Sequence, residues 1–302
     1  MIEIRRLTKR FGAMTALDRV TAAIESGAFV VLLGSNGAGK TTLLRCLAGL
    51  LAFEGAATVG GHDVVKDGKA ARRLIGYVPQ RPSFPPDLTC VEALDLFARL
   101  RGLPGGDPAW LTRVGLDTQA DAAVRTLSGG MRQRLALATA LQSDPAVILF
   151  DEPAAHLDPH ARRALHRDLE ALAKAGRTIL LATHLVADPL AVASRAMVLE
   201  RGRLVYNGRP DAMGAAIQQR VIFTLNGAGP KALADLLESR PGVHVTHTDS
   251  AVVATTPAGT AFDLLAAVAA SGLHPLGVHL EEPSIDAGRL AELPDTPNDP
   301  KD

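Results

Sequence analysis

A glycine-rich loop that ends in lysine and threonine carries the clearest chemical signal in the sequence. It follows Phe29–Leu33, an apolar segment that we expect to be a strand, and leads into a helix-like run. Glycines let backbone N–H groups point inward, and a helix N-terminus adds partial positive charge, so this arrangement suits phosphate. In such a loop Lys40 reaches the β- and γ-phosphates, and Thr41 offers its hydroxyl to Mg²⁺. The predicted phosphate-binding loop (P-loop) is Gly34, Ser35, Asn36, Gly37, Ala38, Gly39, Lys40 and Thr41, with Thr42 beside it.

A second glycine-containing segment begins another predicted helix. Ser128, Gly129 and Gly130 precede a run with apolar residues at helical spacing, so backbone donors are expected at the start of that helix. One subunit has no obvious need for two phosphate-binding segments. Two subunits packed head to tail do, because each nucleotide then lies between the P-loop of one chain and the serine-glycine helix of the other.

Two acidic residues follow the apolar segment Val147–Phe150. Asp151 is expected to bind Mg²⁺, and Glu152 is expected to polarise the attacking water as a general base. Alone, such acids more often belong to an ordinary loop. After a P-loop they favour a site that hydrolyses a nucleoside triphosphate.

These motifs together resemble the ATP-binding cassette (ABC) ATPase family. Leu127-Ser128-Gly129-Gly130-Met131 is similar to that family's LSGGQ signature, with Met131 in place of the usual glutamine, and residues 1 to about 215 follow the family's motif order. The resemblance implies Mg²⁺ and ATP as cofactors and ATP-driven dimerisation. We expect dimerisation to survive the Met131 departure, because Ser128 and the glycine backbone are kept.

The resemblance assigns four further residues. Phe11 is similar to the aromatic residue that stacks on adenine, and Gln80 in Tyr77-Val78-Pro79-Gln80 to the glutamine that senses Mg²⁺ and water. Asp158 is similar to the aspartate that crosses the dimer interface, and His184 to the histidine that contacts the γ-phosphate. The alternatives are that Phe11 is a plain core residue and that His184, which follows an apolar strand, has only a structural role.

The fold class expected is α/β: a P-loop NTPase domain of the ABC ATPase type with a helical subdomain, plus a small C-terminal α+β domain. The predicted domains are residues 1–215, with the helical subdomain at about 81–140, then 217–283, then a partly disordered tail at 284–302. The C-terminal elements follow a ferredoxin-like βαββαβ order. The predicted helices of this C-terminal domain are Pro230–Ser239 and Ala258–Ser271. The largely parallel sheet of the first domain is predicted from Phe29–Leu33, Leu74–Val78, Val147–Phe150, Thr178–Thr183 and Ala196–Glu200.

Composition limits the classes of function. The formal net charge is +0, which argues against a general nucleic-acid binder. The two cysteines, Cys46 and Cys90, form no Cys-x-x-Cys pair and are expected to be core thiols in a reducing compartment. No segment approaches the roughly 20 apolar residues that cross a bilayer. We therefore expect a protein that does not itself cross the membrane, and the resemblance to transport ATPases implies a cytoplasmic protein that is peripheral on the inner face of the membrane.

The resemblance to transport ATPases implies an integral-membrane permease as partner, docked against Pro79–Leu100, together with a second copy of the chain or a paralogous cassette. Residues Leu280–Asp286 resemble a stretch near the end of the ATPases of ABC-2-type exporters. Two alternatives stay open at this point. One is an importer ATPase, and the other is a soluble ABC ATPase that acts on a non-membrane partner, for example in iron–sulfur assembly.

Overall fold

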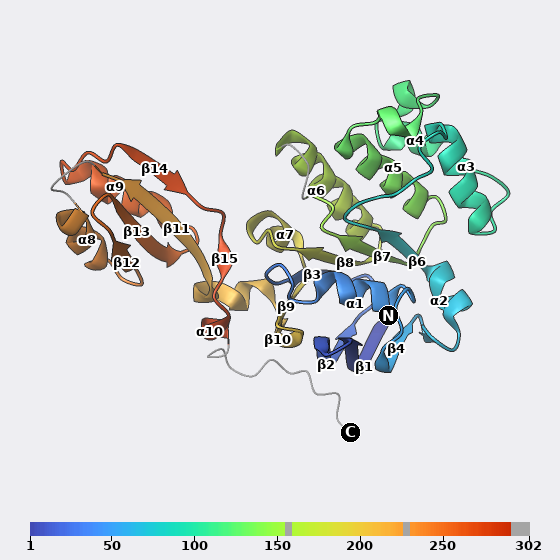
Figure 1. The fold of residues 1–302 in the computed structure, drawn as a ribbon, viewed down its shortest axis with the longest axis horizontal. Coiled ribbons are helices and arrows are strands. Elements are labelled where there is room, and N and C mark those ends of the chain that lie inside the picture. The colour runs from blue at the N-terminus through green and yellow to red at the C-terminus, as the bar shows by residue number, and fades with distance from the viewer. Residues whose placement is uncertain (155–158, 226–229, 291–302) are drawn as a thin grey trace. The chain divides into compact units, whose positions relative to one another are not determined.

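The computed structural model describes residues 1–154, 159–225 and 230–290, drawn in colour in Figure 1. The described chain forms two compact units. The first holds residues 1–184 and 192–208, and the second holds residues 185–191 and 209–290. The predicted division into residues 1–215 and 217–283 stays a prediction.

The first unit is built on a six-stranded sheet in the order β10-β9-β3-β8-β7-β6. All neighbours are parallel except β10, which runs antiparallel to β9. The three central strands are buried on both faces, and their sequences are nearly continuous apolar runs, as a covered parallel sheet requires. The strands are β3 (Phe29–Leu33), β6 (Ile75–Val78), β7 (Val147–Asp151), β8 (Thr178–Thr183), β9 (Arg195–Glu200) and β10 (Arg203–Gly208).

A second, antiparallel sheet in this unit was not anticipated. It has the order β2-β1-β4-β5, formed by β1 (Ile2–Phe11), β2 (Met14–Ile24), β4 (Glu54–Val59) and β5 (His62–Asp63). The register of β1 against β2 shifts between Ile4 and Leu7 and again after Leu7. Arg6, at the first shift, has a φ of 50°. These bulges interrupt the strict apolar–polar alternation that identifies a strand in a sequence.

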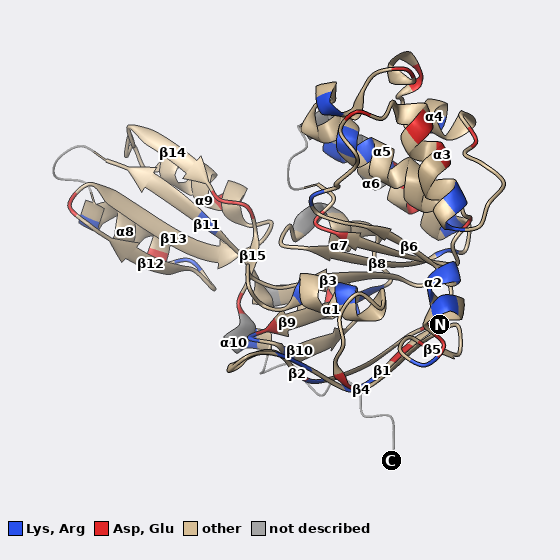
Figure 2. Cartoon of the chain, turned by 45° about the vertical axis from the view of Figure 1, so that its right-hand side comes forward, with Lys and Arg blue, Asp and Glu red and all other residues tan. Residues whose placement is uncertain are grey.

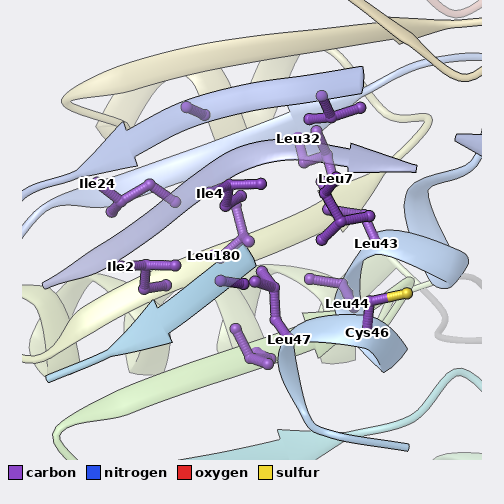
Figure 3. Packing of buried hydrophobic residues seen from close by; sticks show 14 of the residues in the cluster. Ile2, Ile4, Leu7, Ile24, Leu32, Leu43, Leu44, Cys46, Leu47 and Leu180 are labelled. Atoms are coloured by element: carbon purple, nitrogen blue, oxygen red, sulfur yellow. The ribbon is translucent and has the colours of Figure 1, made fainter. Parts of the chain in front are cut away.

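Helix α1 (Lys40–Leu47) lies between the two sheets and contacts strands of both. Leu43, Leu44 and Leu47 on this helix are fully buried, and they pack with Ile2 and Ile4 of β1 in the core of the unit (Figure 3). In Figure 1, α1 covers one face of the parallel sheet, and α5 and α6 cover the opposite face. The helix that starts at the P-loop is therefore fixed from two sides.

The helical insert lies between β6 and β7, as predicted. Thr89 caps α3 through a capping box: its hydroxyl accepts a bond from the Glu92 N–H, and the Glu92 carboxylate accepts one from the Thr89 N–H.

Figure 2 shows charged residues on α3 and α5, whereas β7 and β8 are almost uncharged. The helices of this unit not yet given are α2 (Gly68–Leu74), α3 (Cys90–Leu100), α4 (Ala109–Arg113), α5 (Gly129–Leu141) and α6 (Pro159–Lys174), with short 3₁₀ turns η1 (Asp117–Gln119) and η2 (Val124–Thr126).

The second unit contains an antiparallel sheet in the order β12-β13-β11-β14, with β15 also paired to β11. With the helices, this gives the predicted βαββαβ order and confirms the α+β class. Its elements are α7 (Ala187–Val192), η3 (Pro210–Ala216), β11 (Ile217–Thr224), α8 (Pro230–Glu238), β12 (His244–His247), β13 (Ala251–Pro257), α9 (Ala261–Ala270), β14 (Gly277–Leu280), β15 (Ser284–Ile285) and α10 (Ala287–Leu290).

One boundary in this unit was predicted too early. Helix α9 begins at Ala261, not at Ala258. Gly259 has a φ of 96°, a left-handed conformation that is incompatible with a right-handed helix, so the chain turns before the helix starts.

In the part of the chain that the structure describes, no helix combines the length and apolar character needed to cross a membrane. Asp158, the predicted interface aspartate, lies outside the described residues, as does most of the predicted tail, residues 291–302.

Candidate nucleotide-binding and catalytic site

The P-loop connects the end of β3 to the start of α1, and two of its glycines cannot be replaced by residues with a side chain. A Cβ at Gly34 would lie 2.4 Å from the Leu199 carbonyl oxygen. A Cβ at Gly39, which has a φ of 109° and caps α1, would lie 2.7 Å from the Ala16 carbonyl oxygen. The neighbouring strands therefore pack directly against the loop backbone, and they fix its curvature around the place where phosphates are expected.

Lys40 is folded back over this loop. Its Nζ donates to the carbonyl oxygens of Gly34, at 2.7 Å, and Ser35, at 3.3 Å. The same atom lies 3.2 Å from Oε1 of Glu152, and both side chains are only 6% exposed. Lys40 and Glu152 thus form a buried ion pair between the phosphate-binding loop and the end of β7.

Asp151, the last residue of β7, is completely buried, with its two oxygens held by two hydroxyls. Thr41 Oγ1 donates to Oδ1 at 2.7 Å, and the Tyr77 hydroxyl donates to Oδ2 at 3.1 Å. Burial raises the pKa of Asp151, and the two hydroxyl bonds oppose that shift. Burial and the neighbouring Asp151 raise the pKa of Tyr77 to about 12, so its hydroxyl is protonated at neutral pH and can donate.

Glu152 adopts a left-handed conformation directly after the strand. Its φ is 49°, and its N–H donates to the Ala182 carbonyl oxygen of β8 at 2.9 Å. Such a conformation is uncommon for a residue other than glycine, and it persists only where surrounding bonds hold it. Oε2 lies 2.7 Å from Nδ1 of His184, which follows β8. The carboxylate therefore bridges Lys40 on one oxygen and His184 on the other.

Gln80 faces the same region from the end of β6. It lines a pocket of about 430 Å³ together with Glu152 and residues from the start of α5, including Gly129 and Gln133. The Gln133 side-chain amide donates to the Pro79 carbonyl oxygen at 3.4 Å, which ties α5 to the segment that carries Gln80. The structure thus brings Gln80 and Glu152 to one pocket.

Two further segments with predicted nucleotide contacts, the start of α5 and Phe11, are exposed. Ser128 caps α5: its hydroxyl accepts a bond from the Met131 N–H at 3.2 Å, and Gly129 beside it is exposed. Phe11 is 44% exposed, so it is not a core residue, and Lys9 Nζ lies 4.8 Å from the centre of its ring. Both positions are open to solvent, which their predicted contacts with nucleotide require.

The residues present fit a hard divalent cation. Among the described residues, no three histidine, cysteine, aspartate or glutamate side chains cluster as a metal site made of protein ligands alone would require. The oxygen atoms of Thr41, Asp151 and Gln80 are the ligand type that Mg²⁺ prefers, and Mg²⁺ commonly takes few protein ligands and completes its shell with water and substrate phosphates. The hydrogen bond between Tyr77 and Asp151 was not predicted from the sequence, because a tyrosine within an apolar strand is ordinarily a core residue.

Comparisons with known proteins identify the family of the chain. The family model described as ABC transporter matches residues 17–155. Nod factor export ATP-binding protein I from Paraburkholderia xenovorans is 38% identical over 242 residues, which cover 78% of this chain and 80% of that protein. Human phospholipid-transporting ATPase ABCA7 is 40% identical over 218 residues, 70% of this chain and 10% of that protein.

A solved structure extends the likeness to the fold. It is the dimeric structure of an ATP-binding cassette in a post-hydrolysis state, bound to ADP and Pi. It matches with a TM-score of 0.64 and 27% identity over 70% of this chain and 99% of that one. The chain therefore belongs to the ABC transporter family, in which it is an ATP-binding and ATP-hydrolysing subunit.

Proposed function

We propose that this subunit powers export through a separate integral-membrane partner, by closing on a second cassette around ATP. The observation that carries the proposal is the buried pair of Lys40 and Glu152 at the edge of the P-loop, with the more exposed His184 bonded to the second oxygen of Glu152. Glu152 lies within hydrogen-bonding distance of both Lys40 and His184. This supports a mechanism in which Lys40 binds phosphate, Glu152 takes a proton from water, and His184 orients Glu152.

In the ion pair, Lys40 and Glu152 each balance the charge of the other. A phosphate entering the loop competes for Lys40, and Glu152 is then held by His184 alone. In that arrangement the carboxylate accepts a proton from the water that attacks the γ-phosphate. Bound at Thr41, Asp151 and Gln80, Mg²⁺ would supply charge stabilisation to the phosphate oxygens.

Dimerisation would complete the site from the second chain. The exposed start of α5, with Ser128, Gly129 and Gly130, offers backbone N–H groups at a helix N-terminus, a device that binds anions. The solved relative that is a dimer with ADP and Pi supports this arrangement. We propose that two such helix starts each cover the nucleotide held by the partner's P-loop.

The export direction is supported by the relatives and by the sequence. Nod factor export ATP-binding protein I aligns over most of this chain, and the C-terminal stretch Leu280–Asp286 resembles the ends of exporter ATPases. An importer ATPase or a soluble ATPase in iron–sulfur assembly gains no such support. The membrane partner is expected to dock against Pro79–Leu100, and the subunit would then work at the cytoplasmic face of the membrane.

The central test of the reaction is Glu152→Gln, a change that keeps the size of the side chain and removes its basicity. ATP binding should be kept, and the hydrolysis rate should fall by about 10²–10⁴-fold, the usual contribution of general base catalysis. Glu170→Gln, an exposed glutamate on α6, is the matched control and should hydrolyse ATP at the normal rate. Normal turnover in Glu152→Gln would exclude the proposed base.

The partner is tested by purification from detergent-solubilised native membranes. The tagged full-length chain should recover an integral-membrane protein, and Glu152→Gln in the presence of ATP should recover as much or more. Recovery of soluble proteins alone would remove the export assignment and leave the ATPase assignment standing.

A further inference from the structure

The role of Tyr77 goes beyond the motifs that place this chain in its family. Its hydroxyl bonds to Oδ2 of Asp151 at 3.1 Å, while Thr41 occupies Oδ1 at 2.7 Å. Both donors belong to the same unit but to different elements: Thr41 lies in the first turn of α1, and Tyr77 lies in β6. Each oxygen of this buried carboxylate therefore has its own hydroxyl donor.

Packing alone does not account for a tyrosine at this position. Asp151 has no exposed surface, so an oxygen without a donor would be costly in the folded protein. Phenylalanine would fill the same space as Tyr77 and would leave Oδ2 without that donor. The hydroxyl, and not the ring, is thus the part of Tyr77 that acts on Asp151.

The bond between Tyr77 and Asp151 is also well placed to orient Asp151 as a metal ligand. Thr41 is itself a proposed Mg²⁺ ligand, so the Oδ1 side of Asp151 faces the expected cation. Tyr77 holds the other oxygen, and it belongs to the strand that leads, three residues later, to Gln80. Strand β6 pairs directly with β7, which ends at Asp151, with Tyr77 opposite Leu149.

We propose that Tyr77 is a positioning residue for the metal-binding carboxylate. Its hydroxyl fixes the orientation of Asp151 so that the Thr41-facing oxygen is presented to Mg²⁺, and it thereby sets the affinity of the site for the metal. This inference rests on the proposed Mg²⁺ site at Thr41 and Asp151. It assigns Tyr77 no contact with nucleotide, since Lys40 and the loop hold the phosphates.

The test is Tyr77→Phe in the full-length chain. Partners that orient metal ligands typically contribute about 10–100-fold to metal affinity. We expect the Mg²⁺ concentration for half-maximal ATPase activity to rise about tenfold, with the maximal rate at saturating Mg²⁺ within about twofold of the unmodified chain. Mn²⁺ binding in the presence of ADP, followed by electron paramagnetic resonance, should weaken to the same extent. ATP binding in EDTA should not change.

Tyr206→Phe is the matched control. Tyr206 is the second of the two tyrosines, is 2% exposed, and lies in β10 of the same sheet. This variant should keep the normal Mg²⁺ and Mn²⁺ affinities, which separates loss of the Asp151 bond from loss of a buried hydroxyl in general.

The outcomes distinguish the inference from the function on which it rests. Unchanged Mn²⁺ and Mg²⁺ affinities in Tyr77→Phe would overturn the positioning role, even if the maximal rate fell. Equal losses in Tyr77→Phe and Tyr206→Phe would overturn it as well. If the unmodified chain hydrolysed ATP without any dependence on Mg²⁺, the proposed metal site itself would fail, and the inference with it.

Discussion

The buried pair of Lys40 and Glu152 predicts an unusual pattern of stability in the nucleotide-free protein. Lys40→Ala removes the cation 3.2 Å from Oε1 of a carboxylate that is 6% exposed, and Glu152 then keeps only His184. Removing one partner of a buried pair costs roughly 3–5 kcal/mol of unfolding free energy. We expect about 3 kcal/mol here, at the low end of that range, because the His184 contact remains.

Neutralising the stranded carboxylate should restore part of this loss. The double variant Lys40→Ala with Glu152→Gln has no buried unpaired charge, so we expect it to be about 1 kcal/mol more stable than Lys40→Ala alone. A second substitution that stabilises the first is a strong signature of direct coupling. In the proposed mechanism, contacts with phosphate replace the pair when nucleotide binds, so the experiment is made without nucleotide.

Urea unfolding followed by tryptophan fluorescence is a suitable assay. Trp110, the single tryptophan of the chain, lies in α4 of the first unit, so its emission reports that unit. The exposed pair Lys174 and Glu170, 2.7 Å apart on α6, is the control cycle and should show coupling below about 0.5 kcal/mol. Additive losses in Lys40→Ala with Glu152→Gln would refute the buried pair.

Three further predictions follow from individual contacts. Thr89→Ala removes the capping box of α3 and should cost about 1 kcal/mol of unfolding free energy with no change in ATPase rate; an unchanged melting temperature would contradict it. Phe11→Ala should weaken ATP binding about tenfold in a direct titration, whereas Phe11→Trp should bind normally, and equal affinities would remove the stacking role. Burial raises the pKa of Cys46 from 9.0 to about 11, so the folded state holds the thiol proton more tightly. The contribution of Cys46 to stability is therefore full below pH 9 and is lost as the pH rises to about 11. The Cys46→Ala variant should show a shallower decline in unfolding free energy over that window, and an identical slope would exclude the effect.

The sequence predicted the parts of the site that local patterns define. The P-loop needs glycines, lysine and threonine close together in the sequence. Strand β7 is recognisable as a short apolar run that ends at Asp151. Both signals lie within a few neighbouring residues. The ends of parallel strands meet at one edge of a sheet, so the proximity of Glu152 and His184 follows from the strand predictions.

Contacts between distant segments could not be predicted in the same way. The bond between Tyr77 and Asp151 joins residues 74 positions apart, and nothing near Tyr77 distinguishes its hydroxyl from that of a core tyrosine. The Lys40–Glu152 pair likewise joins the start of α1 to the residue that follows β7, and no local pattern indicates it. The antiparallel sheet was missed because the bulge at Arg6 breaks the period on which strand prediction depends.

Nucleotide-driven pairing of cassettes is the claim on which the proposed function depends most. Analytical ultracentrifugation of Glu152→Gln, with and without ATP, tests it most directly, because slow hydrolysis preserves the bound state. We predict a monomer without nucleotide and a dimer with ATP. A Gly129→Asp change at the exposed start of α5 should abolish the dimer by placing a negative charge against phosphate. A chain that stays monomeric with ATP, while the unmodified protein keeps its full hydrolysis rate at every dilution, would contradict nucleotide-driven pairing.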